Sequence, residues 1–370
     1  MSSLSTQERE RYQRHLSLQE IGPEGQERLK AARVLVVGAG GLGSPAALYL
    51  AAAGCGTLGL ADGDRVELSN LQRQVLFSSA DIGQPKAVRG AEHLAALNPD
   101  IRVNAHAIEL TATNVRELFG QYDLILDGTD RLAAHYLIND ACVLLRRPLV
   151  AAAIHRFEGQ LLTYLPGGPC YRCAFPQGEE AVVANCASAG VLGVLPGVLG
   201  TLQATEAIKL IAGIGAPLVG RLLTYDALEM RFSEYRLERR RDCAVCGDAP
   251  SISAPRTRPA TPAGVQRLSA RGLHELLNAS AQAPPLIDVR EVAEFAAGHL
   301  DGARNIPLGQ LAPQLLGLAG GAAPVFICRS GGRSLAACQM ALAANIASPV
   351  NLEGGMLAWA AEIDPRLKVL

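Results

Sequence analysis

Two pairs of cysteines in this sequence share one spacing. The segments Cys170-Tyr-Arg-Cys173 and Cys243-Ala-Val-Cys246 each place two thiols three positions apart. Two such pairs are typical of a tetrahedral four-thiolate zinc site, which is usually structural when all four ligands come from the protein. A redox disulfide is the alternative, although redox pairs normally occur singly at the start of a helix. The spacing therefore predicts a zinc site that joins two distant segments.

Cys328 stands in a different context. An apolar run at 324–327 leads into Cys328-Arg-Ser-Gly-Gly-Arg, and a helical pattern follows from Ser334. Backbone N–H groups of such a loop and the helix dipole favour a thiolate, and Arg329 and Arg333 add positive charge. A phosphatase loop would need arginine where Ser334 stands, and the tighter loop suits a persulfide sulfur better than a phosphate. We therefore expect a nucleophile here, with an inert buried cysteine as the alternative.

A solitary cysteine, Cys186, follows Asn185 in a loop of small residues. It is either a nucleophile or a small buried hydrophobic residue. Cys55 and Cys142 lie inside helical patterns, so we expect neither of them to react.

A glycine-rich turn, Gly38-Ala-Gly40-Gly41-Leu-Gly43, lies between an apolar run at 33–37 and a helical pattern at 45–53. Glycines let the backbone turn sharply and approach an anion, and free N–H groups at the helix start favour negative charge. The turn predicts a phosphate site. Taken alone it fits dinucleotide-binding folds of many activities.

Charged residues downstream could complete that site. Asp62 ends a short strand at 57–61, where a carboxylate can accept hydrogen bonds from ribose hydroxyls, in a nicotinamide enzyme as well. Arg73 lies in a long polar loop, and Lys86 begins a helical pattern that ends at Leu97. Either cation could instead be an ordinary surface residue.

The charged segment at 6–30 contains Arg11-Tyr-Gln-Arg14. The breaker Gly22-Pro23 follows the helix-prone part, and another helical stretch ends at Lys30. The segment reads as an amphipathic helix packed on the edge of the domain. Alternatively, Arg14 reaches a nucleotide, either its own or that of a partner subunit.

Strands expected at 101–109, 122–127 and 148–154 alternate with helical patterns, which favours a mostly parallel α/β sheet. Ligands of such sheets gather at the carboxyl ends of the strands, where Asp127 and Asp130 stand. From Gly159 onward, shorter strands and loops replace this pattern.

Composition limits the remaining possibilities. The 370 residues carry a net charge of −1 and are 49% hydrophobic, so a nucleic-acid partner is disfavoured and a large core is feasible. No signal peptide or membrane span is evident, which favours a cytoplasmic protein. Residues 248–264 are rich in proline and small residues and predict a linker, after which a second domain follows.

Together these features resemble the adenylating, ubiquitin-activating-type enzymes of the MoeB/ThiF family, fused to a C-terminal rhodanese domain. The first part matches through Arg11-Tyr-Gln-Arg14, the glycine turn, Asp62-Gly-Asp64, Ser69-Asn-Leu-Gln-Arg73-Gln74, Gly83-Gln-Pro-Lys86, both cysteine pairs and Asn185-Cys186. The second part matches through Asp288-Val-Arg290, Gly298-His299, Asn305-Ile-Pro307, the Cys328 loop and Leu352-Glu-Gly-Gly355-Met-Leu-Ala-Trp359.

The resemblance implies a Rossmann-like, zinc-bound adenylyltransferase domain over 1–247, a linker over 248–264 and a smaller α/β rhodanese domain over 265–370. ATP would lie on the turn, with Asp62 at its ribose and Arg73 and Lys86 on phosphate oxygens, while Asp130 would hold Mg²⁺. The nucleotide-binding residues expected on this basis are Gly38, Gly40, Gly41, Gly43, Asp62, Ser69, Asn70, Arg73, Lys86, Asp130 and Arg131.

The implied reaction is adenylation of the C-terminal glycine of a ubiquitin-like sulfur carrier, followed by sulfur transfer from a Cys328 persulfide to give a thiocarboxylate. The implied protein is a homodimer in which Arg14 completes the neighbour's site, and Cys186 would form an acyl intermediate or a disulfide with the carrier. The sulfur donor would be a cysteine desulfurase or thiosulfate. Molybdenum cofactor synthesis is the favoured pathway, and thiamine, cysteine and tRNA thiolation remain open.

Two positions depart from the family pattern. Arg131 replaces the common asparagine after Asp130, and Asn185 replaces the frequent threonine before Cys186. Two other classes of function also stay open. An NAD-dependent oxidoreductase would explain the glycine turn and Asp62 but not Arg73, Lys86 or the Cys328 loop. A zinc-stabilised scaffold would bind a carrier without activating it.

Overall fold

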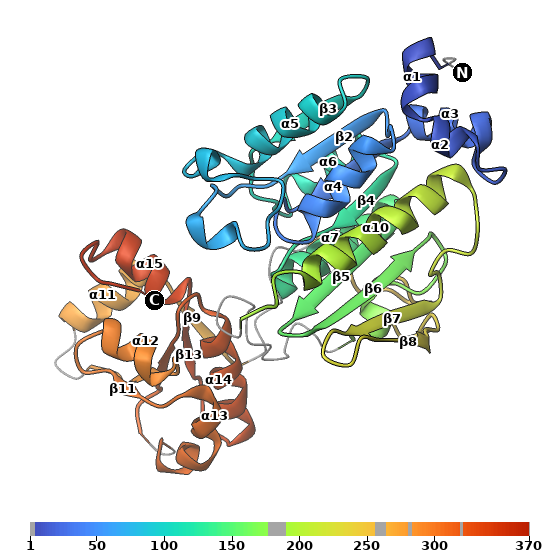
Figure 1. Ribbon diagram of the computed structural model, residues 1–370. Coiled ribbons are helices and arrows are strands. Elements are labelled where there is room, and N and C mark those ends of the chain that lie inside the picture. The colour runs from blue at the N-terminus through green and yellow to red at the C-terminus, as the bar shows by residue number, and fades with distance from the viewer. Residues whose placement is uncertain (1–3, 177–189, 256–263, 280–282, 319–320, 370) are drawn as a thin grey trace. The chain divides into compact units, whose positions relative to one another are not determined.

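The computed structural model describes residues 4–176, 190–255, 264–279, 283–318 and 321–369 (Figure 1). These residues form two compact units, one on each side of residues 256–263. No helix among the described residues is long and apolar enough to cross a membrane.

The first unit is built on an eight-stranded sheet of order β3-β2-β1-β4-β5-β6-β7-β8. Its first five strands are parallel and the remaining strand pairs are antiparallel, which confirms the mostly parallel α/β sheet. The strands are β1 (Arg33–Val37), β2 (Thr57–Ala61), β3 (Arg102–His106), β4 (Leu124–Asp127), β5 (Leu149–His155), β6 (Glu158–Tyr164), β7 (Arg221–Asp226) and β8 (Arg231–Arg236).

Helices cover both faces of this sheet because successive strand residues point to opposite sides. Val34 and Val36 of β1 pack with helices α4 (Gly43–Ala52), α5 (Lys86–Leu97) and α10 (Leu195–Ala212). Leu35 and Val37 pack with α6 (Val115–Gly120) and α7 (Leu132–Leu145) on the other face. Figure 1 shows α4 and α10 side by side, and the many contacts between them agree.

The N-terminal segment forms three short helices, α1 (Thr6–Arg11), α2 (Gln13–Leu16) and α3 (Gly22–Ala31). The second predicted stretch corresponds to α3, which begins at Gly22-Pro23, whereas the first is divided into α1 and α2. Tyr12 is buried between the first two helices, and its hydroxyl accepts a hydrogen bond from Asn98 Nδ2 at 2.9 Å. Asn98 Nδ2 also donates to the carbonyl of Ala51, at the C-terminal end of α4. These helices therefore lie at the end of α4 that is remote from the glycine turn.

The second unit is a smaller α/β domain with a parallel sheet of order β11-β10-β12-β13-β9. Its strands are β9 (Gln266–Leu268), β10 (Leu286–Asp288), β11 (Arg304–Asn305), β12 (Val325–Ile327) and β13 (Val350–Leu352). Its helices are α11 (Ala270–Ala279), α12 (Val292–Ala297), α13 (Leu308–Leu311), α14 (Gly332–Ala343) and α15 (Gly355–Glu362). Phe326 and Ile327 of β12 face opposite sides and belong to two separate hydrophobic clusters.

Candidate functional site

The glycine turn joins β1 to α4 and brings backbone atoms closer together than side chains would allow. Gly38 has a φ of 88°, in the region that favours glycine. A Cβ on Gly43 would lie 1.8 Å from the carbonyl oxygen of Gly38, and one on Gly38 would lie 2.9 Å from that of Gly128. The turn thus brings backbone segments together without intervening side chains, as close approach of an anion to the backbone requires.

Asp62 closes this turn from the end of β2. Its Oδ2 accepts a hydrogen bond from the N–H of Ala39, and its Oδ1 accepts one from the N–H of Asp64, both at 2.8 Å. Burial raises the pKa of Asp62, while the nearby Lys86 ammonium and these two N–H groups partly offset the increase. The carboxylate therefore stands beside the turn, at the predicted ribose position.

Lys86 is not a surface residue. It begins α5 and is only 5% exposed. Its Nζ lies 3.3 Å from Asp64 Oδ2, whose own side chain is 78% exposed. Removing an ammonium group from water is unfavourable unless it is paired, so this buried charge is well placed for a polyanionic ligand.

Arg73 and Gln74 approach the turn from the loop that follows β2. A Cβ on Gly41 would lie 3.5 Å from Arg73 Cγ, and one on Gly40 would lie 3.7 Å from Gln74 Nε2. Arg73 is half-buried and donates from Nη1 to the carbonyl of Ser69 at 3.0 Å. Gln74 is buried, and its Oε1 has no hydrogen-bond partner among the described residues. Gln74 is not among the site residues predicted from the sequence. Its side chain lies beside the turn, and its Oε1 is able to accept a further hydrogen bond.

Ser69 and Asn70 lie in the same loop, on a short 3₁₀ helix at Leu68–Asn70. Ser69 is exposed, whereas Asn70 is buried. Asn70 Oδ1 accepts a hydrogen bond from the N–H of Glu67 at 3.1 Å, so this side chain shapes the loop that carries Arg73.

Asp130 and Arg131 follow β4 at the same edge of the sheet, and both are exposed. An exposed carboxylate suits Mg²⁺, which usually keeps several of its waters. Arg131 donates from Nη1 to Glu109 Oε1 at 3.0 Å, so its guanidinium is engaged with the segment after β3.

A buried network that sequence analysis missed holds the turn before Asp130. Asp127 Oδ1 accepts hydrogen bonds from the N–H and the hydroxyl of Thr129, at 3.0 and 2.8 Å. Asp127 Oδ2 lies 2.7 Å from His135 Nδ1 on α7. Burial lowers the pKa of His135, but the Asp127 carboxylate outweighs burial and raises that pKa above its ordinary value. Asp127 therefore supports the local backbone, and a single histidine within a helical pattern gave no signal of this role.

Arg14 lies on α2 and is exposed. Its neighbours in sequence contact the C-terminal end of α4, through the bonds of Tyr12 and Asn98 described above. The ten residues of α4 separate that end from the glycine turn by about 15 Å. The protein therefore does not bring Arg14 to the nucleotide-site candidates of its own chain.

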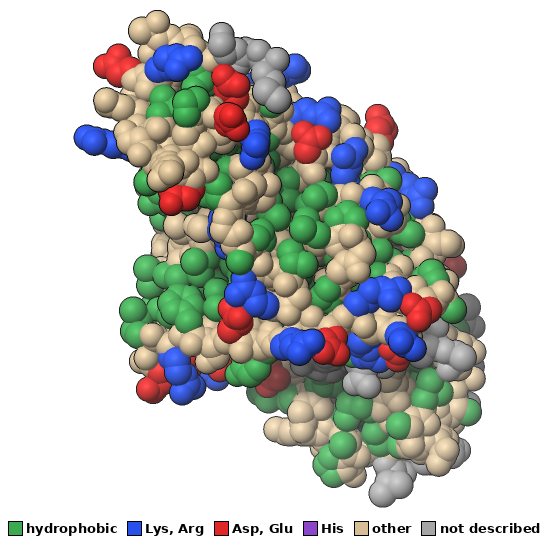
Figure 2. Space-filling model, turned by 90° about the vertical axis from the view of Figure 1, so that its right-hand side faces the viewer, with side chains coloured by type: hydrophobic (Ala, Val, Ile, Leu, Met, Phe, Trp, Pro, Cys, Tyr) green, Lys and Arg blue, Asp and Glu red, His purple; other side chains and the backbone are tan. Residues whose placement is uncertain are grey.

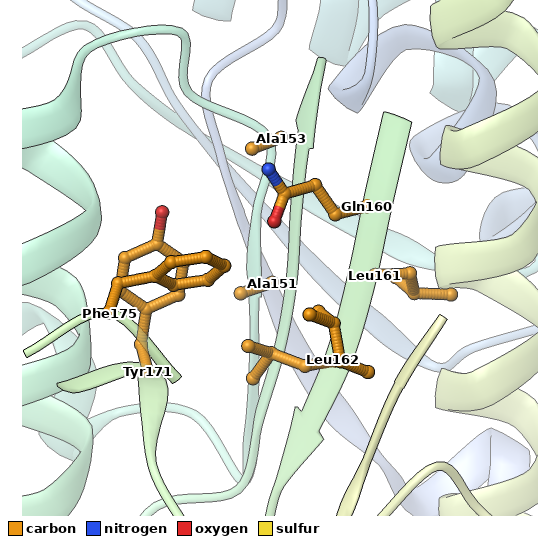
Figure 3. Close-up of a pocket in the computed structure, with 8 residues that line it drawn as sticks. Ala151, Ala153, Gln160, Leu161, Leu162, Tyr171 and Phe175 are labelled. Carbon is orange, nitrogen blue, oxygen red and sulfur yellow. The ribbon is translucent and has the colours of Figure 1, made fainter. Parts of the chain in front are cut away.

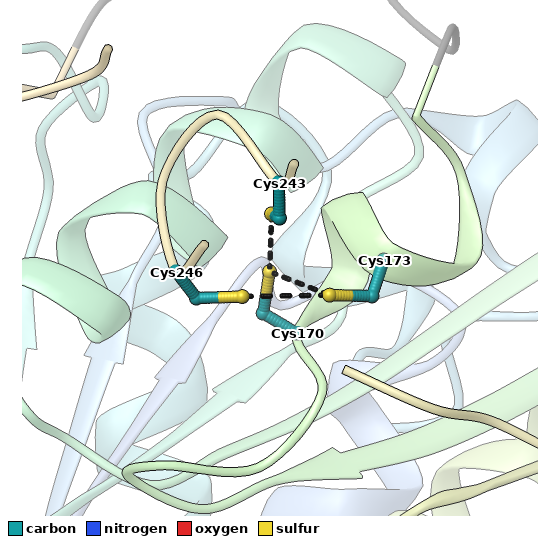
Figure 4. A group of neighbouring side chains, drawn as sticks. All are labelled: Cys170, Cys173, Cys243 and Cys246. Atoms are coloured by element: carbon teal, nitrogen blue, oxygen red, sulfur yellow. Dashed lines mark hydrogen bonds between the residues drawn. The ribbon is translucent and has the colours of Figure 1, made fainter. Parts of the chain in front are cut away.

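The four paired cysteines converge (Figure 4). Their sulfur atoms all lie within 4.8 Å of one another, and three of the sulfur pairs are 3.4, 3.7 and 4.0 Å apart. Tetrahedral Zn–S bonds of about 2.3 Å would place sulfurs about 3.8 Å apart, whereas a disulfide needs about 2.05 Å. Hydrogen bonds among the thiols, that of Cys170 foremost, lower the pKa of Cys173 to about 6. The donor set and spacing therefore fit Zn²⁺ and do not fit a disulfide.

The first cysteine pair is anchored to the sheet through helix α8 (Tyr171–Ala174). Tyr171 stacks on His135 with ring centroids 5.5 Å apart, and Arg172 forms a buried, two-bond ion pair with Asp140 at 2.7 and 2.8 Å. Figure 3 shows Tyr171 and Phe175 beside β5 and β6, where Ala151 and Ala153 leave a shallow hollow. The cysteine cluster is thus coupled by packing to the network that holds the Asp130 turn.

We predict that the purified protein contains one tightly bound zinc ion per chain and that Cys243→Ser removes it. The substitution should also lower the Tm of the first unit by roughly 10 °C. A structural zinc contributes several kcal/mol, and about 1 kcal/mol shifts the Tm of a unit of this size by about 2–4 °C. Metal analysis and calorimetry measure both effects.

Cys142→Ala is the matched control, because Cys142 is buried on α7 outside the cluster. It should retain the metal. A wild-type protein without zinc, or a Cys243→Ser variant that keeps it, would contradict the assignment.

Asn185 and Cys186 lie outside the described residues, so the predicted role of Cys186 stays a prediction.

The Cys328 loop connects β12 to α14. Cys328 is only 1% exposed, and its Sγ accepts hydrogen bonds from the N–H of Gly331 at 3.1 Å and from the Ser334 hydroxyl at 3.3 Å. The first N–H groups of α15 donate to the loop carbonyls, including Met356 N–H to Cys328 O at 2.8 Å. The start of α15 thus holds the loop by its carbonyls, and the N–H of Gly331 is directed toward the sulfur.

Arg333 adds positive charge near this loop, as expected, and the pKa of its guanidinium is raised by Glu294 first and also by the Cys328 sulfur. It is also paired, because both of its Nη atoms donate to the Glu294 carboxylate at 2.7 Å. This ion pair lowers the pKa of Glu294, so the carboxylate is ionised at neutral pH. Glu294 thus offsets part of the positive charge that Arg333 brings to the loop, and the Gly331 N–H and the Ser334 hydroxyl donate to the sulfur directly.

Comparisons with known proteins match both units. The family model described as the ThiF family matches residues 12–245, and that of the rhodanese-like domain matches residues 269–362. A "Sulfur carrier protein adenylyltransferase" of Thermus thermophilus is 51% identical over 252 residues, 66% of this chain and 93% of that protein. A "Probable adenylyltransferase/sulfurtransferase MoeZ" of Mycobacterium tuberculosis is 42% identical over 384 residues, 98% of this chain and 96% of that protein. The crystal structure of E. coli MccB with ATP gives a TM-score of 0.54 at 25% identity, covering 60% of this chain and 69% of that one.

Proposed function

Since this chain belongs to the ThiF family and also carries a rhodanese-like domain, we propose that it adenylates a ubiquitin-like sulfur carrier and then transfers sulfur to it. The observation that carries the proposal is the presence in one chain of two anion-binding loops with different chemistry. The glycine turn stands beside the buried Lys86, and the second loop surrounds the Cys328 sulfur with N–H and O–H donors. We propose domain boundaries of 1–247 and 265–370, with a linker between them.

In the first reaction, the C-terminal glycine carboxylate of the carrier attacks the α-phosphorus of ATP and pyrophosphate leaves. The backbone of the glycine turn at Gly41, together with Lys86 and Arg73, binds phosphate oxygens, and Asp62 binds the ribose. Asp130 would hold Mg²⁺, which neutralises charge on the leaving pyrophosphate. In reactions of this kind, most of the rate enhancement comes from charged and hydrogen-bonding groups that the protein already holds in position around the transition state.

In the second reaction, the terminal sulfur of a Cys328 persulfide attacks the acyl carbon and AMP leaves. The product is an acyl disulfide between the carrier and Cys328. A second thiol then attacks Cys328 Sγ, which releases the thiocarboxylate and leaves a disulfide. Cys186 would form an acyl intermediate or a disulfide with the carrier.

A protein substrate is also supported by the surface of the first unit. β8 is an edge strand, and exposed apolar side chains gather on and before it, including Leu228, Met230 and Phe232. Figure 2 views the side on which β7 and β8 lie in Figure 1, and hydrophobic patches are visible there between charged side chains. Exposed apolar groups beside an open strand edge are typical of a protein-binding surface.

A homodimer is supported by the position of Arg14. This residue lies at the opposite end of α4 from its own glycine turn, so it would act on the nucleotide of a second copy. We further propose a cytoplasmic protein that functions in molybdenum cofactor synthesis. A cysteine desulfurase or thiosulfate would supply the sulfur.

The decisive experiment is intact-mass analysis of candidate carriers that end in Gly-Gly. Each carrier is incubated with the full-length protein, ATP, Mg²⁺ and a sulfur source, and the expected result is conversion of its carboxylate to a thiocarboxylate. Omitting only the sulfur source should leave an ATP-dependent adenylate. Tight NAD binding without ATP–pyrophosphate exchange would instead favour an oxidoreductase.

A further inference from the structure

A buried polar pair lies behind the Cys328 sulfur. Ser334, on the first turn of α14, is fully buried, and Asn351 of β13 is 5% exposed. The Ser334 hydroxyl lies 3.3 Å from Cys328 Sγ and 2.6 Å from Asn351 Oδ1. The three side chains therefore form a short row that ends at the reacting sulfur.

The Ser334 hydroxyl has a single proton, and two acceptors lie within its reach. When Cys328 is a thiol, its S–H can donate to Ser334 Oγ, which leaves the hydroxyl proton for Asn351. When the sulfur is an anion, it has no proton to give and needs donors itself. The hydroxyl must then leave Asn351 Oδ1 in order to donate to the sulfur.

We propose that Asn351 competes with Cys328 for the Ser334 proton and thereby sets how readily the sulfur of this loop becomes an anion. The proposal deepens the proposed function, because it concerns the form of Cys328 that accepts and carries sulfur. Ser334 touches the reacting sulfur and is a catalytic residue in this sense. Asn351 acts through Ser334 and is a positioning residue.

The reaction served by this pair balances without a further reactant. The Cys328 thiolate attacks the outer sulfur of thiosulfate or of a persulfide, and the S–S bond of the donor breaks. Sulfite or the donor thiolate leaves with the electron pair, and Cys328 carries a persulfide anion. Gly331 N–H stays in place throughout, so Ser334 is the donor whose direction changes with the charge on the sulfur.

The experiment measures the rate at which iodoacetamide alkylates Cys328 in the full-length protein, read by peptide mass so that other cysteines do not contribute. Ser334→Ala removes a hydrogen bond to the anion and should slow alkylation at neutral pH by about tenfold. Asn351→Leu removes the competing acceptor and should accelerate it. The pH profile of the rate should move to higher pH in the first variant and to lower pH in the second.

The double variant Ser334→Ala/Asn351→Leu tests the competition directly. With no hydroxyl to compete for, the leucine should have no effect, and the rate should equal that of Ser334→Ala. Asn351→Asp keeps an acceptor and adds negative charge, so it should slow alkylation. This variant provides the test if Asn351→Leu does not fold. An Asn351→Leu variant that slows alkylation, or equal effects of that change with and without Ser334, would overturn the proposal.

Sulfur loading separates this inference from the proposed function. If Ser334→Ala reacts like the wild type while Cys328 still acquires sulfur from thiosulfate, the competition is disproved and the function stands. If wild-type Cys328 acquires no sulfur from thiosulfate or from glutathione persulfide, the proposed function of this unit fails whatever the alkylation rates.

Discussion

Replacing Lys86 with alanine should lower the rate of adenylate formation by about 100- to 1,000-fold. Lys86 is buried beside the glycine turn and Asp62, and we propose that it binds a phosphate oxygen whose negative charge grows during attack. Loss of one such donor typically costs about 3–4 kcal/mol of transition-state stabilisation. ATP–pyrophosphate exchange in the presence of a carrier measures the effect.

Arg89→Ala is the matched control, because Arg89 is a cation one turn further along α5. It pairs with Asp81, with Nε and Oδ1 2.8 Å apart, and does not approach the turn. This variant should retain exchange activity. Wild-type exchange activity in Lys86→Ala would show that the proposed phosphate site is wrong. A wild-type protein that binds the carrier but has no exchange activity would instead indicate a zinc-stabilised scaffold without adenylation activity.

Replacing Cys328 with alanine should abolish thiocarboxylate formation and leave adenylate formation unchanged. The sulfur of Cys328 is the group on which we expect the persulfide to form, and alanine offers no atom that could carry the transferred sulfur. Sulfur transfer from thiosulfate to cyanide measures the first activity, and pyrophosphate exchange measures the second.

Cys338→Ala is the control within the same unit. Cys338 is buried on α14, and burial raises the pKa of its thiol to about 12, so we expect no reactivity from it. Its removal should spare both activities. Loss of adenylation together with sulfur transfer in Cys328→Ala would contradict the assignment of the two activities to two units.

The parallel half of the first sheet could be predicted because β1, β2 and β4 contain short apolar runs separated along the chain by helical patterns, whereas β3 shows only an alternating pattern. The glycine turn, the cysteine pairs and the Cys328 loop could also be read from spacing, since their chemistry depends on residues close together in sequence. Lys86 could not be separated from a surface lysine, because its burial depends on how α5 packs against α4 and β3.

The sequence could not predict the roles of side chains whose partners lie far away along the chain. Nothing near Arg333 indicates that Glu294 of α12 pairs with it. His135 acquires its role from Asp127 on one side and from Tyr171, in a different element, on the other. In the sequence, Ser334 indicates only that the loop is not a phosphatase loop. Its hydrogen bonds to Cys328 and Asn351 depend on how β12, α14 and β13 pack together.

The placement of α1 and α2 at the far end of α4 has a genetic consequence if Arg14 serves the neighbouring copy. A chain with a defective Arg14 would keep an intact site of its own and would disable the site of its neighbour. In a dimer of one mutant and one wild-type chain, such an allele would inactivate the site of the wild-type chain. Conversely, a chain defective at Arg14 and one defective at Lys86 would together form one complete site, so two inactive alleles would restore each other in the same cell.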